Sequence, residues 1–207
     1  MFKETKTSHL AAYILHLMGG EMLADDLMRM LYLMDRESYR TRAYPITGDI
    51  AEASASGPVL RTTRSLLLGC FESEHWERFI SPVSEDNKVT LVTPIGLPVF
   101  YTTTEPNGST TENVVGYTEL GHLSAGNRVM AESVVANYRA KEAWTPDNMA
   151  NEFPEMQDAT GYGKSIPVPS ILRVVGYSED AIGEIMEDLD DREEHERLSL
   201  LHAPGVR

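Results

Sequence analysis

The stretch EMLADDLMRMLYLMDRESYR, residues 21–40, limits the fold of this chain more than any other feature of the sequence. Its apolar residues recur at the spacing of one helix face. Pro45 follows closely and cannot be accommodated inside a helix. The pattern therefore predicts a long amphipathic helix over 21–40 and a break after it. The apolar face consists of Leu23, Leu27, Met30, Leu31 and Met34.

Two backbone constraints follow that helix. In AYPITGD, Pro45 stops a helix and Gly48 permits a positive φ. Further along, Gly57 and Pro58 constrain the backbone again. We therefore expect a fixed corner with a short extended segment between the two constraints. Proline is favoured in the first turn of a helix, so Pro58 is expected to begin a helix over 58–72.

Charged side chains at the end of the long helix offer a way to hold this corner. Asp35 or Arg36 is expected to bond the exposed backbone groups of the corner. Contact of the same residues with a partner molecule is the alternative. Arg61 and Arg64 lie one turn apart on the next predicted helix, and they could share this task or pair with Asp49.

The rest of the chain alternates helical and extended patterns. A helix is predicted over 7–18, before the pair Gly19-Gly20. β-Branched and aromatic residues, with a Pro-Asn-Gly turn signal, predict two or three antiparallel strands over 88–118. Further helices, with serine, threonine or proline near their starts, are predicted over 125–140, 146–153, 169–175 and 178–194.

These elements predict an α+β fold that is mainly α: a helical domain with a small antiparallel two- or three-stranded hairpin layer. Residues 1–207 are expected to form a single domain, because no linker interrupts them. Within it we expect a helical core over 8–80, a β-hairpin region over 87–118 and C-terminal helices over 124–195.

Charge and cysteine content restrict the possible partners and sites. The net charge of −14 disfavours nucleic acid and favours a basic protein partner. The single cysteine, Cys70, excludes an internal disulfide and a multi-cysteine zinc site, and its apolar neighbours predict that it is buried. No signal peptide and no apolar run long enough to span a membrane is found, so we expect a cytoplasmic protein.

Three motifs suggest chemistry, and each fails on its spacing or context. TGYGKSIP ends like a phosphate-binding loop but has Asp158 where the first glycine is required. SASGPV lacks the elbow that a seryl nucleophile needs. Glu72, Glu74 and His75 could gather around a metal ion, although Phe71 and Trp76 favour the end of a core helix. We therefore predict no catalytic residues, no metal and no cofactor.

The C-terminal run SEDAIGEIMEDLDDREEHER carries ten acids between Glu179 and Glu196. A solvated helix face is one interpretation, and a docking strip for a basic partner is the other. The apolar stripe of this helix, more often core than interface, consists of Ile182, Ile185, Met186 and Leu189.

Residues 27–59 resemble the opening motif of the Panacea domain, the domain of SocA-like antitoxins and many phage-associated proteins. The pattern runs Leu-x-Lys-Leu-Leu-Tyr-Leu-x-Asp, then Pro-Ile-x-Gly-Asp, then Gly-Pro-Val. A weaker match covers residues 149–176. The matching positions are Leu27, Leu31, Tyr32, Leu33, Asp35, Pro45, Ile46, Gly48, Asp49, Gly57, Pro58 and Val59.

The resemblance implies a helix-rich domain that acts by binding. Its relatives neutralise a toxin by direct contact, and the SocA-like type also bridges a toxin to the ClpXP protease. A cognate toxin or host-defence protein, in a bacterium or a phage-infected cell, is then the expected partner. The residues expected to bind that partner or to form the motif scaffold are Tyr32, Asp35, Arg36, Pro45, Ile46, Gly48, Asp49, Gly57 and Pro58.

Three classes of function remain open at this point. The first is an antitoxin-like or phage counter-defence protein that masks a partner. The second is an enzyme with an unrecognised hydrolase or nucleotide-modifying activity, which Asp35→Asn or Asp49→Asn would inactivate without unfolding the protein. The third is a DNA-binding regulator, against which the acidic balance and the lack of a Lys/Arg-rich helix weigh.

Overall fold

The computed structural model describes residues 1–95, 98–104, 110–117, 120–140 and 151–201. The chain divides into two compact units, which are described separately here. Unit 1 consists of Met1–Lys3, Tyr32–Thr62 and Ala143–Arg207. Unit 2 consists of Glu4–Leu31 and Thr63–Glu142. That the whole chain is one domain stays a prediction.

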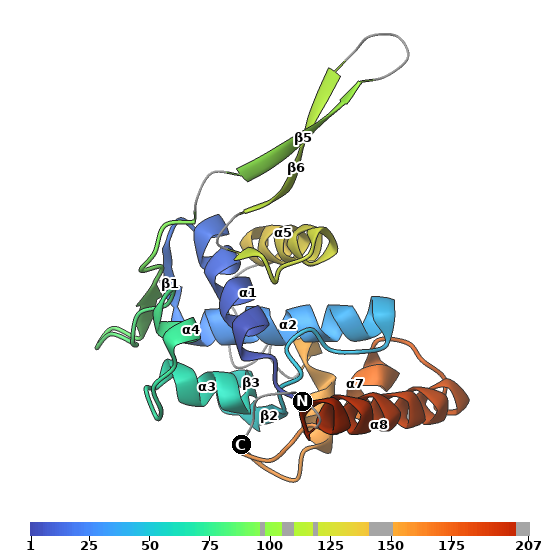
Figure 1. Cartoon of the computed structure of the whole chain (residues 1–207). Coiled ribbons are helices and arrows are strands. Elements are labelled where there is room, and N and C mark those ends of the chain that lie inside the picture. The colour runs from blue at the N-terminus through green and yellow to red at the C-terminus, as the bar shows by residue number, and fades with distance from the viewer. Residues whose placement is uncertain (96–97, 105–109, 118–119, 141–150, 202–207) are drawn as a thin grey trace. The chain divides into compact units, whose positions relative to one another are not determined.

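The fold is mainly α with small two-stranded antiparallel sheets, which confirms the predicted fold class (Figure 1). The helices are α1 (Glu4–Leu17), α2 (Ala24–Arg42), α3 (Arg61–Leu67), α4 (Glu74–Glu77), α5 (Ala125–Ala140), the 3₁₀ helix η2 (Pro154–Asp158), α7 (Val168–Val174) and α8 (Glu179–Leu201). The strands are β1 (Glu21–Leu23), β2 (Ala51–Ser54), β3 (Gly57–Leu60), β4 (Lys88–Thr90), β5 (Pro98–Thr104) and β6 (Thr110–Tyr117).

The long helix predicted over 21–40 is α2, displaced by a few residues. It begins at Ala24 because Glu21–Leu23 form strand β1, which pairs antiparallel with β4. Strand β4 therefore does not join the predicted hairpin layer, which consists of β5 and β6 alone. Helix α5 begins where predicted, and the hydroxyl of Ser124 accepts the backbone N–H of Asn127 at 3.2 Å.

The predicted bounds of three other helices agree with the structure to different degrees. Helix α7 (Val168–Val174) is displaced by one residue from the stretch predicted at 169–175, and α8 continues seven residues past the predicted end at 194. Of the helix predicted over 146–153, residues 146–150 lie outside the described residues, and 151–152 are helical.

The prediction that Pro58 begins a helix over 58–72 is wrong. Pro58 lies in strand β3, opposite Ala53 of β2, and the helix starts only at Arg61. Within the described residues β3 is an edge strand, where a residue that lacks a backbone N–H is tolerated. Cys70 was also predicted wrongly, because α3 ends at Leu67 and leaves the cysteine exposed.

Unit 2 is built around α1, whose Leu10, Ile14 and Leu15 are completely buried. Helix α5 packs against it, and the hydroxyl of Tyr13 donates to Glu132 at 2.7 Å. None of the residues that the resemblance assigns to the corner belongs to this unit. Unit 1 contains the corner, the β2–β3 hairpin, η2, α7, α8 and the second half of α2, and it is therefore the unit that carries the candidate site.

Candidate functional site

Asp35 holds the corner that follows α2. Its carboxylate accepts the backbone N–H groups of Ile46, at 2.7 Å, and of Thr47, at 2.9 Å. The hydroxyl of Thr47 donates to the second carboxylate oxygen. Asp35 is thus the side chain that bonds the backbone of the corner, as expected for Asp35 or Arg36. Burial raises the pKa of this carboxyl to about 6, although its hydrogen bonds act in the opposite direction.

Gly48 meets two requirements at the tip of the corner. Its φ is +65°, a conformation that side chains rarely adopt. A Cβ at this position would lie 2.1 Å from the backbone oxygen of Met1, because the N-terminal residues run beside the corner. The N–H of Lys3 donates to the carbonyl oxygen of Thr47 at 2.7 Å. A side chain at position 48 is therefore excluded by conformation and by space.

Asp49 ties the corner to the segments that follow. One carboxylate oxygen accepts the N–H of its neighbour Ile50, at 2.8 Å, and that of Thr62 in the first turn of α3, at 3.0 Å. Arg61, which was expected to help at the corner or to pair with Asp49, forms an ion pair with Glu52. Both motif acids thus bond backbone N–H groups, which is a structural use of a carboxylate.

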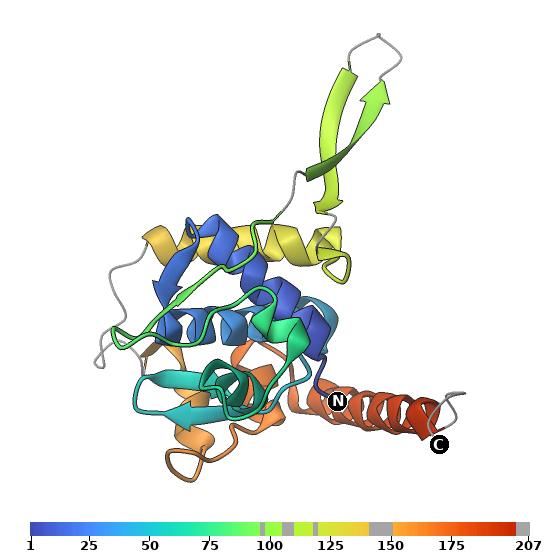
Figure 2. The same ribbon diagram turned by 60° about the vertical axis from the view of Figure 1, so that its left-hand side comes forward.

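The weaker of the two matching segments lies beside the hairpin of the stronger one (Figure 2). Ala53 donates its N–H to Lys164 and accepts that of Gly163, at 3.0 and 2.8 Å. The N–H of Ile166 donates to the carbonyl oxygen of Ala51 at 2.8 Å. Segment 163–166 therefore continues the β2–β3 sheet on the other side of β2. Sequence reasoning did not predict this pairing.

Arg36 acts away from the corner, in a buried cluster with Tyr32 and Glu155. The Nε of Arg36 lies 3.2 Å from Glu155 Oε1, and its Nη1 donates to the carbonyl oxygen of Glu152 at 2.9 Å. The hydroxyl of Tyr32 donates to the same Oε1 at 2.5 Å. Burial and the charge of Glu155 raise the pKa of Tyr32, which stays protonated. The ring of Phe153 lies edge-on to that of Tyr32.

Sequence analysis missed Glu155, although its side chain is completely buried. Its second carboxylate oxygen has no hydrogen-bond partner among the described residues. Nothing in the pattern around it separates this acid from the exposed acids nearby. Its only signal was its place in the second matching segment, 149–176.

A cavity of about 260 Å³ lies between these elements of unit 1. Its polar walls come from α2 and the corner: Tyr32, Asp35, Arg36, Tyr39 and Asp49. Apolar residues of the hairpin and of the segment leading into α7, among them Ala51, Leu60 and Ile166, complete it. Of the nine predicted site residues, four therefore line one cavity. The other five, Pro45, Ile46, Gly48, Gly57 and Pro58, shape the backbone around it and do not line it.

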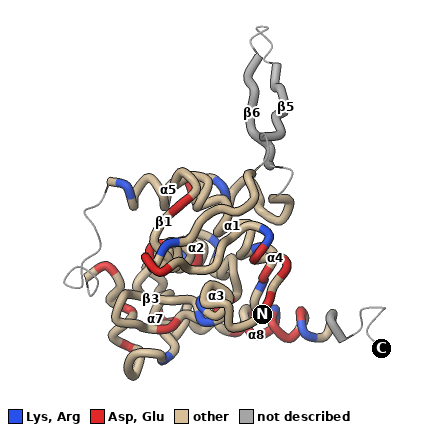
Figure 3. Tube along the Cα trace, turned by 90° about the vertical axis from the view of Figure 1, so that its left-hand side faces the viewer, with Lys and Arg blue, Asp and Glu red and all other residues tan. Residues whose placement is uncertain are grey.

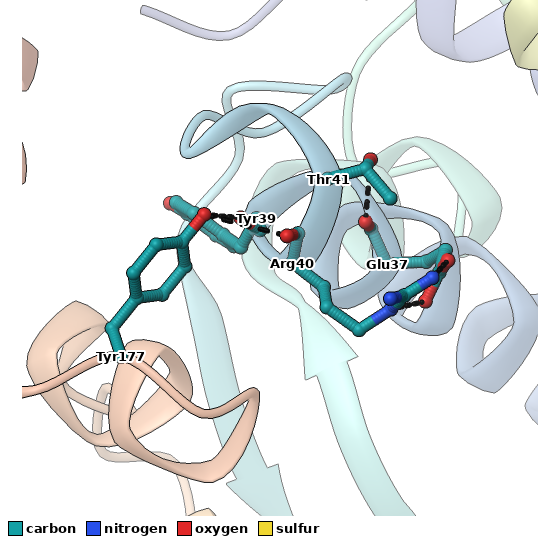
Figure 4. Close-up of polar contacts among 5 residues, drawn as sticks. All are labelled: Glu37, Tyr39, Arg40, Thr41 and Tyr177. Carbon is teal, nitrogen blue, oxygen red and sulfur yellow. Dashed lines mark hydrogen bonds and ion pairs between the residues drawn. The ribbon is translucent and has the colours of Figure 1, made fainter.

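Tyr177, between α7 and α8, contacts the end of α2. Its hydroxyl lies 3.1 Å from the carbonyl oxygen of Tyr39 and 3.3 Å from that of Arg40 (Figure 4). The N–H of Ala43 also donates to the carbonyl oxygen of Tyr39, at 2.9 Å, so Tyr177 adds a donor from outside the helix at its last turn. Glu37 pairs with Arg40 on the same turn. The helix end behind the cavity is fixed in this way.

Helix α8 differs from the cavity walls, because most of its acids are exposed. Figure 3 marks the acidic positions along its trace in red. Of its apolar stripe only Ile182 is buried, whereas Ile185, Met186 and Leu189 are partly buried. Arg192 lies over the ring of Tyr44, 5.3 Å from its centre. In the described part of α8 the acids therefore belong mostly to a solvated face.

Comparison with known protein families shows to which family the chain belongs. The family model of the SocA-like antitoxin, Panacea domain, matches residues 27–153, which is more than half of the chain. The chain belongs to this family. The match includes the long helix, the corner and the hairpin, and it ends at Phe153 beside Tyr32. No curated protein and no solved structure matches the chain.

Membership of the Panacea family agrees with the structural role of the two motif acids, Asp35 and Asp49. An antitoxin acts through binding, and here Asp35 and Asp49 hold backbone in place. Within the described residues, no three His, Cys, Asp or Glu side chains are grouped so that they could hold a metal ion. No helix in the described ranges is both long and apolar enough to cross a membrane.

Proposed function

We propose that this Panacea-family protein neutralises a toxin or a host-defence protein by direct contact. The family membership is the observation that carries the proposal. The net charge of −14 favours a basic partner, because opposite charges steer the two proteins together. The cytoplasm of a bacterium, or of a phage-infected cell, is the place where such a partner would be met.

The resemblance also suggests a finer proposal. The chain would bridge its toxin to the ClpXP protease and act as an adaptor, and its gene would be carried by a phage or another mobile element. The adaptor role predicts that the half-life of the toxin falls when the chain and ClpXP are both present. An unchanged half-life in cells with and without ClpXP would contradict the adaptor role and leave neutralisation intact.

A survival assay tests neutralisation itself. A tagged chain is used to isolate a stoichiometric partner, and that partner is then expressed alone in a test bacterium. We expect growth arrest by the partner alone and recovery of colony counts by orders of magnitude when the chain is co-expressed. A partner that does not impair growth would overturn the proposal, as would a chain that fails to restore growth while it binds the partner.

A further inference from the structure

The cavity in unit 1 is richer in negative than in positive charge. Among the described residues of its walls the acids are Asp35 and Asp49 and the cation is Arg36, whose guanidinium is paired with Glu155 at 3.2 Å. The three donors to Asp35 in the described part of the chain, two backbone N–H groups and the Thr47 hydroxyl, are uncharged. Burial raises the pKa of Asp35, and the neighbouring charge of Asp49 acts in the same direction. A cation is therefore the ion that these walls favour.

Tyr39 adds an unused polar group. The side chain is 94% buried and lines the cavity, and within the described ranges its hydroxyl makes no hydrogen bond. A ligand with an N–H donor in the cavity would satisfy this hydroxyl.

The size and the other walls indicate the shape of the ligand. A volume of about 260 Å³ is just below the roughly 300 Å³ at which pockets for drug-sized molecules begin. Ala51, Leu60 and Ile166 provide apolar surface. A short apolar stem that ends in a positive charge fits this combination, and lysine and arginine side chains have that form.

We propose that the cavity receives a lysine or arginine side chain of the protein partner, whose cationic group bonds Asp35 and the hydroxyl of Tyr39. The inference rests on the proposed function for the existence of that partner. In this proposal the partner is recognised at residues 27–59, the segment that carries the family motif. Helix α8 then contributes only long-range attraction.

Titration of the purified full chain with n-butylguanidinium tests the inference, with n-butylurea as the neutral control of the same shape. Resonances of Tyr39, Ala51 and Ile166 are followed by nuclear magnetic resonance. We expect saturable shifts at these residues, and a dissociation constant at least tenfold weaker for the urea. Equal binding of the two compounds would overturn the inference, as would shifts that avoid the cavity.

Matched variants place the binding in the cavity. Tyr39→Phe removes only the unused hydroxyl and is expected to weaken butylguanidinium binding about fivefold to tenfold. Ala51→Leu fills the cavity and is expected to abolish binding. Tyr162→Phe removes the hydroxyl of an exposed side chain that does not line the cavity, and it should leave binding unchanged. Unchanged binding by Tyr39→Phe would overturn the inference, even where Ala51→Leu does not fold.

The titration uses the chain without its partner. Its failure therefore removes the cavity inference and leaves toxin neutralisation to the survival assay. Conversely, a chain that binds butylguanidinium in the cavity but rescues no toxin-expressing cells contradicts the proposed function alone.

Discussion

Unit 1 carries acidic side chains in two contrasting settings. Around the cavity, Asp35 and Glu155 are buried and hydrogen-bonded to groups that the fold has placed for them. Along α8 the acids are more numerous, but most are exposed. The comparison teaches that a dense run of exposed acids holds little of the fold in place, since solvent screens each exposed charge. The few buried carboxylates around the cavity determine more of the structure than the many exposed acids of α8.

The largest expected effect comes from breaking the buried pair. Arg36→Met leaves Glu155 as a buried charge without its cation, which should lower the free energy of unfolding by about 3–5 kcal/mol. Urea denaturation measures this loss. The double variant Arg36→Met/Glu155→Gln should recover much of the stability, because the buried charge is removed as well. A loss below about 1 kcal/mol in the single variant would show that the pair is already solvated.

Asp35 gives the next largest effect. Asp35→Ala leaves the N–H groups of Ile46 and Thr47 without their acceptor, and we expect a loss of about 2–4 kcal/mol. Asp35→Asn keeps an acceptor oxygen and should lose about 1 kcal/mol. Denaturant midpoints of the two variants, compared side by side, measure the difference. Equal losses would contradict the backbone-holding role.

The pH dependence of stability probes the same carboxyl. Its pKa is about 6 in the folded protein and 3.8 when unperturbed, so the folded state binds the proton more tightly. The contribution of Asp35 to stability is therefore fully present below pH 3.8 and is lost as the pH rises through about 6. Between pH 4 and 7 we expect the stability difference between the wild type and Asp35→Asn to change by about 2–3 kcal/mol. A stability difference that does not change between pH 4 and 7 would contradict the raised pKa of Asp35.

Helix α8 should give the smallest effect. The triple variant Glu187→Gln/Asp188→Asn/Asp191→Asn removes three exposed charges, and the free energy of unfolding is expected to change by less than about 0.5 kcal/mol. Thermal unfolding at two salt concentrations checks this. A loss of unfolding free energy as large as that of Asp35→Ala would contradict the contrast between the buried acids around the cavity and the exposed acids of α8.

The sequence was informative where local chemistry decides the structure. The spacing of apolar residues predicted α2, and proline and glycine at 45 and 48 predicted the corner that Asp35 holds. Prediction from the sequence failed where pairing between distant segments determines the local structure. Residues 51–60 form a hairpin that is extended by segment 163–166, and β1 takes the first residues of the expected helix. Propensity within 58–72 contains no information on those partners.

The cavity was predicted only in part for the same reason. Tyr32, Asp35 and Asp49 were selected from the motif and Arg36 from the charged end of the long helix, and all four line the cavity. Tyr39 and Glu155 were not selected. Their significance comes from burial, which depends on how η2 and the segment before α7 pack, and nothing in their local sequence shows this.

Hydrogen–deuterium exchange on the full chain, free and in complex with its stoichiometric partner, tests the central claim most directly. The account predicts that protection on binding is concentrated at residues 49–60 and 165–168, around the cavity. Protection confined to α8, with the cavity segments exchanging as in the free chain, would contradict it.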